Sequence, residues 1–248
     1  MIGCTTYMNL PINFKSELAS TGKLRAGMNL GNTLFTGKDN SGHLCGVSVD
    51  LMQELAKHLG VPLEMVIYDQ PGQVADDSTK DIWDVAILAI EKTRAKTVSF
   101  SPAMTEIEAG YVVHKGSNIQ LCQQVDTKGI KIAAPEKAGY ELFLTSELKN
   151  ASLVRTKNFA ASIEIFNQKQ VDVLAGLKPN LIESKDKMPQ GELLEGNFMT
   201  VNHGFAIPIG RSAGDMYLRS FVKELIASGF IAKSIEKHQI KGLTAIRN

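Results

Sequence analysis

The stretch Trp83-Asp84-Val85-Ala86-Ile87-Leu88-Ala89 is a nearly continuous apolar run, and such a run is typical of a strand that is buried on both faces. A second run of this kind covers 171–177. Short apolar runs alternate along the chain with segments of helical period, which is the pattern of layered α/β proteins. The sequence therefore predicts an α/β fold.

The residues before this run already alternate between strand and helix. We predict strands at Leu24–Asn29 and Leu63–Tyr68, with a helix over 48–59 between them. Ser48 is a candidate N-cap for that helix, and Gly60 is a candidate stop signal.

After Gly110 the alternation starts again. The predicted elements are strands at 111–114, 130–134, 152–156, 171–177 and 205–209, and helices at 139–148, 159–166 and 218–226. The two halves share this rhythm but no sequence, which indicates two similar lobes.

The composition narrows the choice of partners. The 248 residues are 44% hydrophobic and 21% charged, close to the average for globular proteins. The formal net charge is only +1 and no Lys/Arg run stands out, so nothing favours a nucleic-acid or membrane partner. No run approaches the roughly 18 apolar residues of a membrane helix.

The cysteines and the short motifs give no sign of a prosthetic group. Cys4, Cys45 and Cys122 are far apart and odd in number, which argues against a disulfide framework or a zinc site. The sequence also lacks HExxH, a GxxxxGK[ST] phosphate loop and a dinucleotide-binding glycine pattern. We therefore expect free thiols, no metal site, no cofactor and no catalytic residues.

The N-terminal segment does not resemble an export signal. Residues 1–15 carry neither the basic start nor the apolar run of a secretory signal peptide. Two explanations stay open: the protein is not exported by the usual route, or its signal has been removed.

Several short motifs follow one another from Lys23 to Gly210. They are Lys-Leu-Arg-Ala-Gly-Met-Asn at 23–29, Gly-Val-Ser-Val-Asp-Leu-Met-Gln-Glu-Leu-Ala-Lys-His-Leu-Gly-Val at 46–61, the run at 83–89, Thr-Arg-Ala-Lys-Thr-Val-Ser-Phe-Ser-Pro at 93–102, Gln-Val-Asp-Val-Leu-Ala-Gly at 170–176 and Gly-Phe-Ala-Ile-Pro-Ile-Gly at 204–210. Each motif alone is weak, but together they resemble the landmarks of the bacterial family 3 extracellular solute-binding proteins. The chain is most similar to a branch with Trp-Asp-Val-Ala followed by Arg-Ala, often without an obvious export signal.

The resemblance implies the type II periplasmic-binding-protein fold, in which two α/β lobes are joined by a two-strand hinge and hold a ligand in the cleft between them. Lobe 1 would comprise 1–109 and 203–248, and lobe 2 would comprise 110–202. The resemblance also implies a monomer that works with an ABC transporter permease in the periplasm or another extracytoplasmic compartment. Because this chain shows no signal peptide, a cytoplasmic location stays open.

Arg94 is the first candidate for ligand binding. In the family, an arginine six residues before a Phe-Ser pair grips the carboxylate of the ligand, and Phe100 and Ser101 match that spacing. A guanidinium offers two parallel charge-assisted hydrogen bonds to a carboxylate. The alternative is a solvated arginine between Lys92 and Lys96.

Other positions depart from the family's amino-acid binders. The family clamps the ammonium of the ligand with an aspartate five residues after the position of Asp172, and Leu177 stands there. Asn32 and Val47 occupy two positions that are usually aromatic, and the segment from Asp84 to Arg94 is about two residues shorter than usual. The predicted ligand is therefore an amino-acid-like molecule or an organic acid in a branch without the usual clamp, and we expect plain α-amino acids to bind poorly.

Four further candidates in lobe 1 or at the lobe crossing each have a second interpretation. Asn29 and Asn32 follow the first strand, where open α/β sheets bind ligands, but both could simply shape a turn. Glu91 could accept a ligand cation or pair with a neighbouring base. Glu108 lies where the chain should cross between the lobes, so it could face the cleft or brace the hinge.

Candidates in lobe 2 lie at helix and strand ends. Gly139 and Tyr140 open a predicted helix whose amides could hold an anion or only water, and Tyr140 could form an aromatic wall or pack in the core. Lys178 could bring positive charge to the cleft or be an exposed lysine. We interpret His203, at the return crossing, as structural.

Two classes of function fit this sequence. The first is a non-enzymatic binding protein that closes on a small carboxylate-containing molecule for ABC-type uptake or sensing. The second is an enzyme on the same scaffold, of the cyclohexadienyl or arogenate dehydratase type, with Glu91, Glu108 or Lys178 as acid or base. None of these three has a recognisable catalytic partner, so we predict the binding protein.

Overall fold

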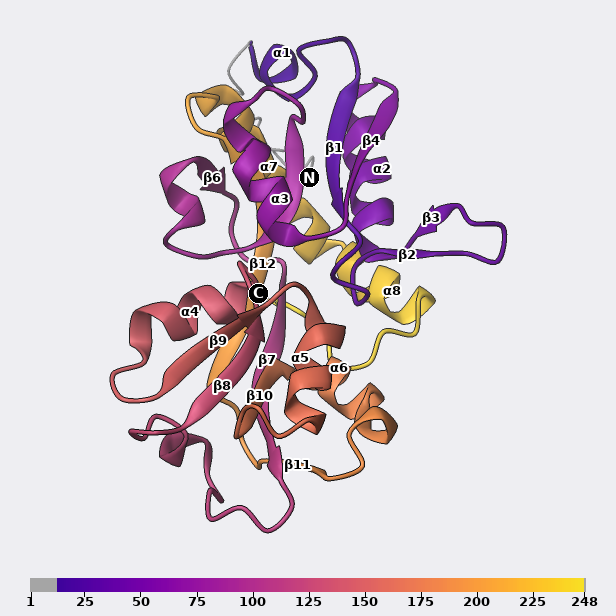
Figure 1. Cartoon of the computed structure of the whole chain (residues 1–248). Helices are drawn as coiled ribbons and strands as arrows, with labels where there is room; N and C mark the ends of the chain where they lie inside the picture. Colours follow the sequence, from indigo (N-terminus) through magenta and orange to yellow (C-terminus); the bar gives the residue numbers. More distant parts are fainter. Residues whose placement is uncertain (1–12, 248) are drawn as a thin grey trace, which may run out of the picture.

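The computed structural model of the chain describes residues 13–247, and its main strands form one curled mixed sheet (Figure 1). The strand order is β4-β1-β5-β12-β7-β10-β8-β9. These strands are β1 (Leu24–Asn29), β4 (Leu63–Tyr68), β5 (Val85–Ala89), β7 (Thr105–His114), β8 (Lys131–Pro135), β9 (Ser152–Thr156), β10 (Val173–Leu177) and β12 (Met199–Pro208). The elements at the two ends of the sheet form two lobes, with β7 and β12 between them (Figure 1).

Lobe 1 contains the end of the sheet formed by β4, β1 and β5. Strand β1 runs parallel to both neighbours, with Asn29 opposite Tyr68 and Ala26 opposite Val85. The helices of this lobe are α1 (Phe14–Leu18), α2 (Val47–Leu59), α3 (Pro71–Asp76), α7 (Ser212–Ala227) and α8 (Phe230–Lys237). Helices from the first and last parts of the described chain thus lie in this lobe, and β13 (Thr244–Ala245) pairs with the crossing strand β7.

Lobe 2 contains the other end of the sheet. Parallel strands β10, β8 and β9 are joined by helices, as expected of βαβ units. Helix α4 (Gly139–Glu147) joins β8 to β9, α5 (Phe159–Asn167) joins β9 to β10, and α6 (Lys178–Glu183) follows β10.

Shorter elements complete the fold. They are the strands β2 (Gly37–Lys38), β3 (Leu44–Cys45), β6 (Val98–Phe100), β11 (Gly191–Leu193) and β13 (Thr244–Ala245), and the 3-10 turns η1 (Asp77–Thr79), η2 (Arg94–Lys96), η3 (Cys122–Gln124) and η4 (Lys185–Lys187).

Two long antiparallel strands join the lobes. The chain leaves lobe 1 in β7 and returns in β12, and the two strands pair from Met199 opposite Ala109 to His203 opposite Thr105. Strand β12 also pairs with β5, and β7 also pairs with β10, so the hydrogen-bonded sheet continues through the junction. The predicted type II fold, with two lobes on a two-strand hinge, is confirmed. The predicted boundaries at 109/110 and 202/203 fall inside these strands.

A buried ion-pair cluster fixes the start of β5. The carboxylate of Asp84 is fully buried, and it accepts hydrogen bonds from Arg25 Nη2 at 2.8 Å and Arg211 Nη1 at 2.9 Å. A buried charge is tolerated when it is paired in this way. Trp83, beside it, is buried and donates from Nε1 to the Val74 carbonyl oxygen at 2.9 Å. The polar residue in the apolar run thus ties β5 to β1 and to the segment before α7.

Helix α2 is capped two residues earlier than predicted. Its N-cap is Gly46 and not Ser48, which is buried inside the first turn. Gly46 has φ 115°, and a Cβ there would lie 2.5 Å from the Phe35 carbonyl oxygen. Only glycine tolerates both conditions. The close approach of two backbone segments therefore sets the start of this helix.

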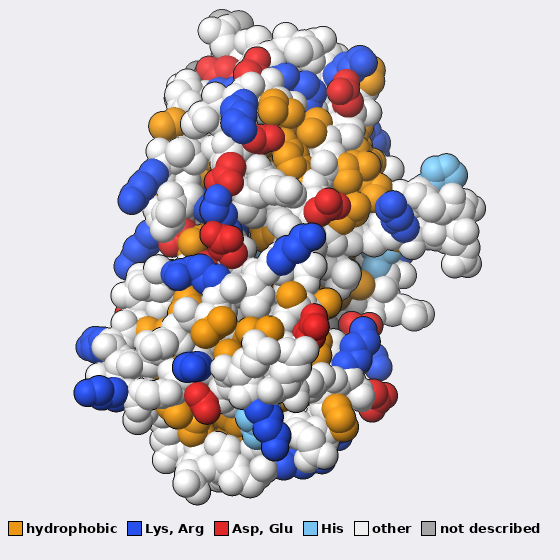
Figure 2. Space-filling view, viewed as in Figure 1, with side chains coloured by type: hydrophobic (Ala, Val, Ile, Leu, Met, Phe, Trp, Pro, Cys, Tyr) orange, Lys and Arg blue, Asp and Glu red, His pale blue; other side chains and the backbone are white. Residues whose placement is uncertain are grey.

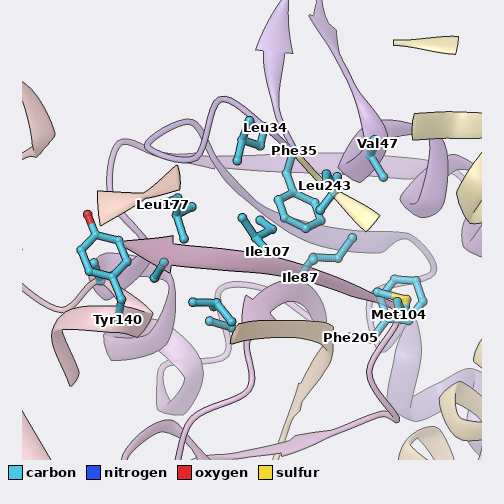
Figure 3. Packing of buried hydrophobic residues seen from close by; sticks show 14 of the residues in the cluster. Leu34, Phe35, Val47, Ile87, Met104, Ile107, Tyr140, Leu177, Phe205 and Leu243 are labelled. Atoms are coloured by element: carbon cyan, nitrogen blue, oxygen red, sulfur yellow. The ribbon is translucent and has the colours of Figure 1, made fainter. Parts of the chain in front are cut away.

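The main hydrophobic core runs through both lobes. Phe35, Ile87 and Ile107 belong to the same cluster of buried side chains as Tyr140 and Leu177 of lobe 2 (Figure 3). Apolar contact thus continues across the junction between the lobes.

Candidate functional site

A cavity of about 260 Å³ lies between the two lobes. Its walls are the carboxyl ends of β1 and β5, the first residues of α4, α5 and α6, and the crossing strand β12. Strand ends and helix starts of this kind are the usual ligand-binding edge of open α/β sheets. The lining residues are Asn29, Gly31, Asn32, Phe35, Gln70, Pro71, Ile87, Leu88, Ala89 and Arg94 from lobe 1, Pro135, Ala138, Gly139, Tyr140, Asn158, Phe159, Ala160, Leu177 and Asn180 from lobe 2, and Val201 and His203 from β12.

Arg94 lies in the wall of this cleft and is only 4% exposed. Its Nη1 donates to the Ala89 carbonyl oxygen at 3.2 Å, and its Nη2 donates to the Lys137 carbonyl oxygen of lobe 2 at 2.8 Å. Within residues 13–247, no carboxylate forms an ion pair with this guanidinium. Burial lowers the pKa of Arg94 to about 10, so the group stays charged at neutral pH. The cleft therefore contains a buried cation without an anionic contact.

Glu91 supports Arg94 through the backbone. Its Oε2 accepts hydrogen bonds from the Thr93 amide at 2.8 Å and from the Arg94 amide at 3.2 Å. The Glu91 carboxylate does not line the cleft, although its charge acts to raise the pKa of Arg94. In this structure Glu91 holds the turn that presents the arginine.

Asn29 and Asn32 both line the cleft. The Asn29 Oδ1 accepts from the Gly31 amide at 2.9 Å, and the Asn32 Oδ1 accepts from the Leu34 amide at 3.3 Å. These bonds shape the loop that follows β1, as in Asx turns. The two interpretations of these residues are therefore compatible: they form the turn at the wall of the cleft.

In lobe 2, Gly139 and Tyr140 line the cleft at the start of α4. A Cβ on Gly139 would lie 2.7 Å from the Ala89 Cβ of lobe 1, so the helix start packs directly against the end of β5. Tyr140 is 7% exposed, and burial raises the pKa of its phenol. Tyr140 and Leu177 lie at one end of the cluster of buried hydrophobic side chains (Figure 3).

The structure does not bring Glu108 and Lys178 into the cleft. They form an ion pair with each other at 2.7 Å, and Asn197 Nδ2 donates to Glu108 Oε1 at 2.9 Å. Hydrogen bonding to Lys178 lowers the pKa of Glu108. Because side chains alternate along β7, Glu108 points away from the face that buries Ile107 and Ala109. The hinge-bracing interpretation of Glu108 fits this geometry.

Among the described lining residues, Gln70, Asn158, Asn180 and His203 are polar and were not predicted as ligand contacts. The Nδ1 of His203 and the Oδ1 of Asn180 are buried, line the cleft and have no hydrogen-bond partner among the described residues. Asn180 lies in the first turn of α6, directly after β10, so the strand-end argument used for Asn29 could have found it. His203 had been interpreted as structural, and a lone histidine in a strand carries no signal that distinguishes the two roles.

His203 is 5% exposed, and its ring lies 4.6 Å from that of Phe35. Burial, and then the charge of Arg94, lowers the pKa of His203 to about 3. The imidazole is therefore neutral at physiological pH, and it can either donate or accept one hydrogen bond at Nδ1.

The described side chains that line the cleft include a positive charge but no negative charge. Among the residues within 13–247 that line it, none is Asp, Glu or Lys. On the outer surface, by contrast, acidic and basic side chains are interspersed over both lobes (Figure 2). Arg94 is thus the charged side chain among the described residues that line the cleft.

The described part of the chain has neither a metal-binding cluster nor a helix that could cross a membrane. Residues 13–247 hold no group of three or more His, Cys, Asp and Glu arranged to bind a metal ion. None of the helices in this range is both long enough and apolar enough to span a bilayer.

Two curated relatives are named for the binding of L-cystine and of glutamine. The L-cystine-binding protein TcyJ of Escherichia coli (strain K12) is 29% identical over 143 residues, which are 57% of this chain and 53% of TcyJ. The chain thus matches about half the length of this relative. The ABC transporter glutamine-binding protein GlnH of Bacillus subtilis (strain 168) is 23% identical over 218 residues, or 84% of this chain and 77% of GlnH.

Solved structures share the fold. The ancestral amino acid-binding protein AncCDT-1, a precursor of cyclohexadienyl dehydratase, superposes with a TM-score of 0.73 at 22% identity over 90% of this chain and 98% of its own. The sequence model of the bacterial extracellular solute-binding proteins, family 3, matches residues 24–240. That span covers both lobes, both crossing strands and the cleft, and so the chain belongs to this family.

Proposed function

We propose that the protein captures a small carboxylate-bearing solute between its lobes and delivers it to an ABC transporter permease or a sensor outside the cytoplasm. The observation that carries this proposal is Arg94, a buried cation in the cleft with no anionic contact. A buried charge of this kind is costly unless a partner neutralises it, and a ligand carboxylate would be that partner.

The cleft has the polarity of a binding site. Most of its walls are apolar, with Arg94 and a few amide and imidazole groups placed among them. Small-molecule sites combine apolar walls with a small number of polar groups in this way. In addition to Arg94, we propose Asn29, Asn32, Gly139 and Tyr140 as ligand contacts, because each lines the same cavity.

Closure is the proposed mechanism of capture. We propose that lobe 1 (1–109 and 203–248) and lobe 2 (110–202) rotate about 108–111 and 201–204, the middle parts of β7 and β12. In the structure the lobes touch: Lys137 Nζ lies 2.6 Å from Asp76 Oδ2, and the Lys137 carbonyl oxygen accepts from Arg94. These contacts exist only when the lobes are together, so they favour the closed form in which a ligand is enclosed.

The acid and base candidates of the enzymatic alternative lie outside the cleft. Glu91, Glu108 and Lys178 were its candidates, and none of them lines the cavity. A general acid or base must reach the reacting atom within hydrogen-bond distance. The position of these three residues therefore supports binding over dehydration.

Native mass spectrometry of the purified protein, followed by thermal-shift screening of small acids, tests the proposal. A true ligand at a hundredfold excess over Kd should raise the free energy of unfolding by about 2.7 kcal/mol. Stabilisation by an acid without turnover supports a binding protein. Conversion of the same acid into a product would assign an enzyme, and failure of every carboxylate to stabilise the protein would contradict the proposal.

A further inference from the structure

We propose that the preferred solute is a monoanionic acid whose second polar group is neutral, such as a hydroxyl or an acylated nitrogen, in place of a free ammonium. This inference rests on the proposed function and narrows the class of its ligand.

Charge neutrality in the closed cleft favours a monoanion. Arg94 contributes one buried positive charge, and no Asp or Glu among the described residues lines the cavity. A monoanionic acid would bring the enclosed net charge to zero. A zwitterionic amino acid adds as many positive as negative charges, so the enclosed site would keep a net charge of +1. An unpaired buried charge is strongly disfavoured.

The nearby carboxylates are already engaged outside the cavity. The Asp76 carboxylate is paired with Lys137 Nζ at 2.6 Å, and Glu91 accepts two backbone hydrogen bonds. Both raise the pKa of Arg94 through space, but neither lines the cleft, where it could contact a ligand ammonium.

The wall of lobe 2 is apolar where β10 ends. Leu177 is 7% exposed and lies in the cleft wall with Tyr140 and Phe159. An ammonium held against this leucine would lose its water without gaining an anionic partner, whereas a methyl or an acyl group would pack there.

Two uncharged side chains in the cleft wall are available to hydrogen-bond the second polar group of the ligand. Asn180 Oδ1 is a buried acceptor without a partner among residues 13–247, and it can accept from a ligand O–H or amide N–H. His203 Nδ1 is likewise buried and unpartnered in that range, and its side chain is more than nine-tenths buried in the cleft wall. Because its low pKa keeps the imidazole neutral, His203 adds no second cation that would call for a dianion.

Calorimetric titration with matched trios of ligands tests the inference. Each trio contains an L-amino acid, its N-acetyl derivative and its L-2-hydroxy analogue, with the side chains of glycine, leucine, phenylalanine and glutamine. We expect at least one acetylated or hydroxy acid to bind ten times more tightly than its parent amino acid or better. If amino acids bind as tightly as both partners, or if no acetylated or hydroxy acid binds at all, the inference is overturned.

The variant Asn180→Asp adds a carboxylate with almost no change in shape. This variant should reverse the order of affinities within a trio. The affinity for the free amino acid should rise, and the affinity for the acetylated and hydroxy acids should fall by at least tenfold. Asn167→Asp, at an exposed position in α5, is the matched control and should leave the order unchanged. An unchanged order in Asn180→Asp would remove Asn180 from the recognition site and contradict the inference.

Different results would contradict the ligand class and the proposed function. Amino acids that bind tightly and depend on Arg94 overturn the ligand class but leave the proposed function intact. Acids that bind to Arg94→Met as tightly as to the wild-type protein would contradict the proposal that Arg94 anchors the ligand.

Discussion

Arg94 Nη2 on lobe 1 donates a 2.8 Å hydrogen bond to the carbonyl oxygen of Lys137 on lobe 2. A buried cation that belongs to one lobe is thus held partly by the backbone of the other. Charge-assisted hydrogen bonds of this kind are stronger than neutral ones. Separation of the lobes must break this bond. A ligand carboxylate bound to Arg94 would therefore lie beside a contact that holds the lobes together.

Gly139→Ala should hold the lobes apart. The added methyl group would lie 2.7 Å from the Ala89 Cβ, and both atoms belong to short side chains that cannot move away. Since alanine is a better helix former than glycine, lobe 2 itself should not be weakened. We expect at least a tenfold loss of affinity for an acid ligand, and a radius of gyration that no longer falls on ligand addition.

Gly37→Ala is the control for that variant. The nearest neighbour of the added Cβ would be Cys45 Sγ at 3.9 Å, which is an ordinary contact. The backbone φ of Gly37 is not positive. This variant should bind and compact like the wild type. Normal compaction in Gly139→Ala would mean that the contact with Ala89 is not part of closure.

Asp76→Asn should weaken binding slightly and in a salt-dependent manner. The pair with Lys137 joins the lobes but is about half exposed, with side-chain exposures of 54% for Asp76 and 47% for Lys137. Exposed ion pairs contribute at most about 1 kcal/mol, so we expect less than about a fivefold loss of affinity at low ionic strength. At 1 M salt the variant and the wild type should converge.

The matched control for Asp76→Asn is Glu64→Gln, which removes an exposed pair with Lys23 inside lobe 1. It should not change affinity at any salt concentration. An equal loss in both variants would show that the effect of Asp76 is not specific to the lobe interface.

His203 should make the protein less stable as the pH falls below neutral. Burial lowers its folded-state pKa to about 3, whereas the unfolded chain titrates near the ordinary value of 6.5. Between these values the unfolded state binds more protons, so this contribution to stability is complete above pH 6.5 and is lost as the pH falls toward 3. At pH 5 the loss should be about 2 kcal/mol.

Urea unfolding at pH 7 and pH 5 measures this effect. His203→Gln should remove most of the difference in the free energy of unfolding between pH 7 and pH 5. His43→Gln, at an exposed position, should keep that difference. A His203→Gln variant with the wild-type pH dependence would contradict a neutral buried imidazole.

The sequence predicted the strands inside each lobe better than the strands between the lobes. Leu24–Asn29, Leu63–Tyr68 and Ser152–Thr156 have the predicted bounds, because each is an uninterrupted strand pattern ended by turn residues or by a helix pattern. The crossing strands were predicted too short: 111–114 is only the last part of β7, and the predicted strand 205–209 begins late in β12, which runs from Met199 to Pro208. Their first halves alternate between buried and exposed side chains, which is the pattern of a half-buried strand and was not used in the prediction.

The position of Arg94 in the cleft could be expected from the family resemblance, because its distance to Phe100 and Ser101 matches the family motif. The structure does place Arg94 in the cleft wall. Glu108 and Lys178 could not be placed in this way, because their ion pair joins residues that are 70 positions apart in the chain. Pairing between distant elements is a property of the packed fold, and the identity of either residue alone does not reveal it.

The anchor variant is Arg94→Met, which keeps a long side chain but removes the charge. Arg219→Met is its control, because Arg219 is a half-exposed arginine in α7 whose ion pair with Asp215 lies outside the cleft. Circular dichroism should show both variants folded.

Isothermal titration of the best acid ligand into wild-type protein and Arg94→Met tests the central claim most directly. Loss of charge-assisted hydrogen bonds to a desolvated carboxylate should cost about 1.5–3 kcal/mol or more, which is roughly a tenfold to more than hundredfold rise in Kd. The account predicts a loss of this size in Arg94→Met and none in Arg219→Met. An unchanged Kd in Arg94→Met would contradict it.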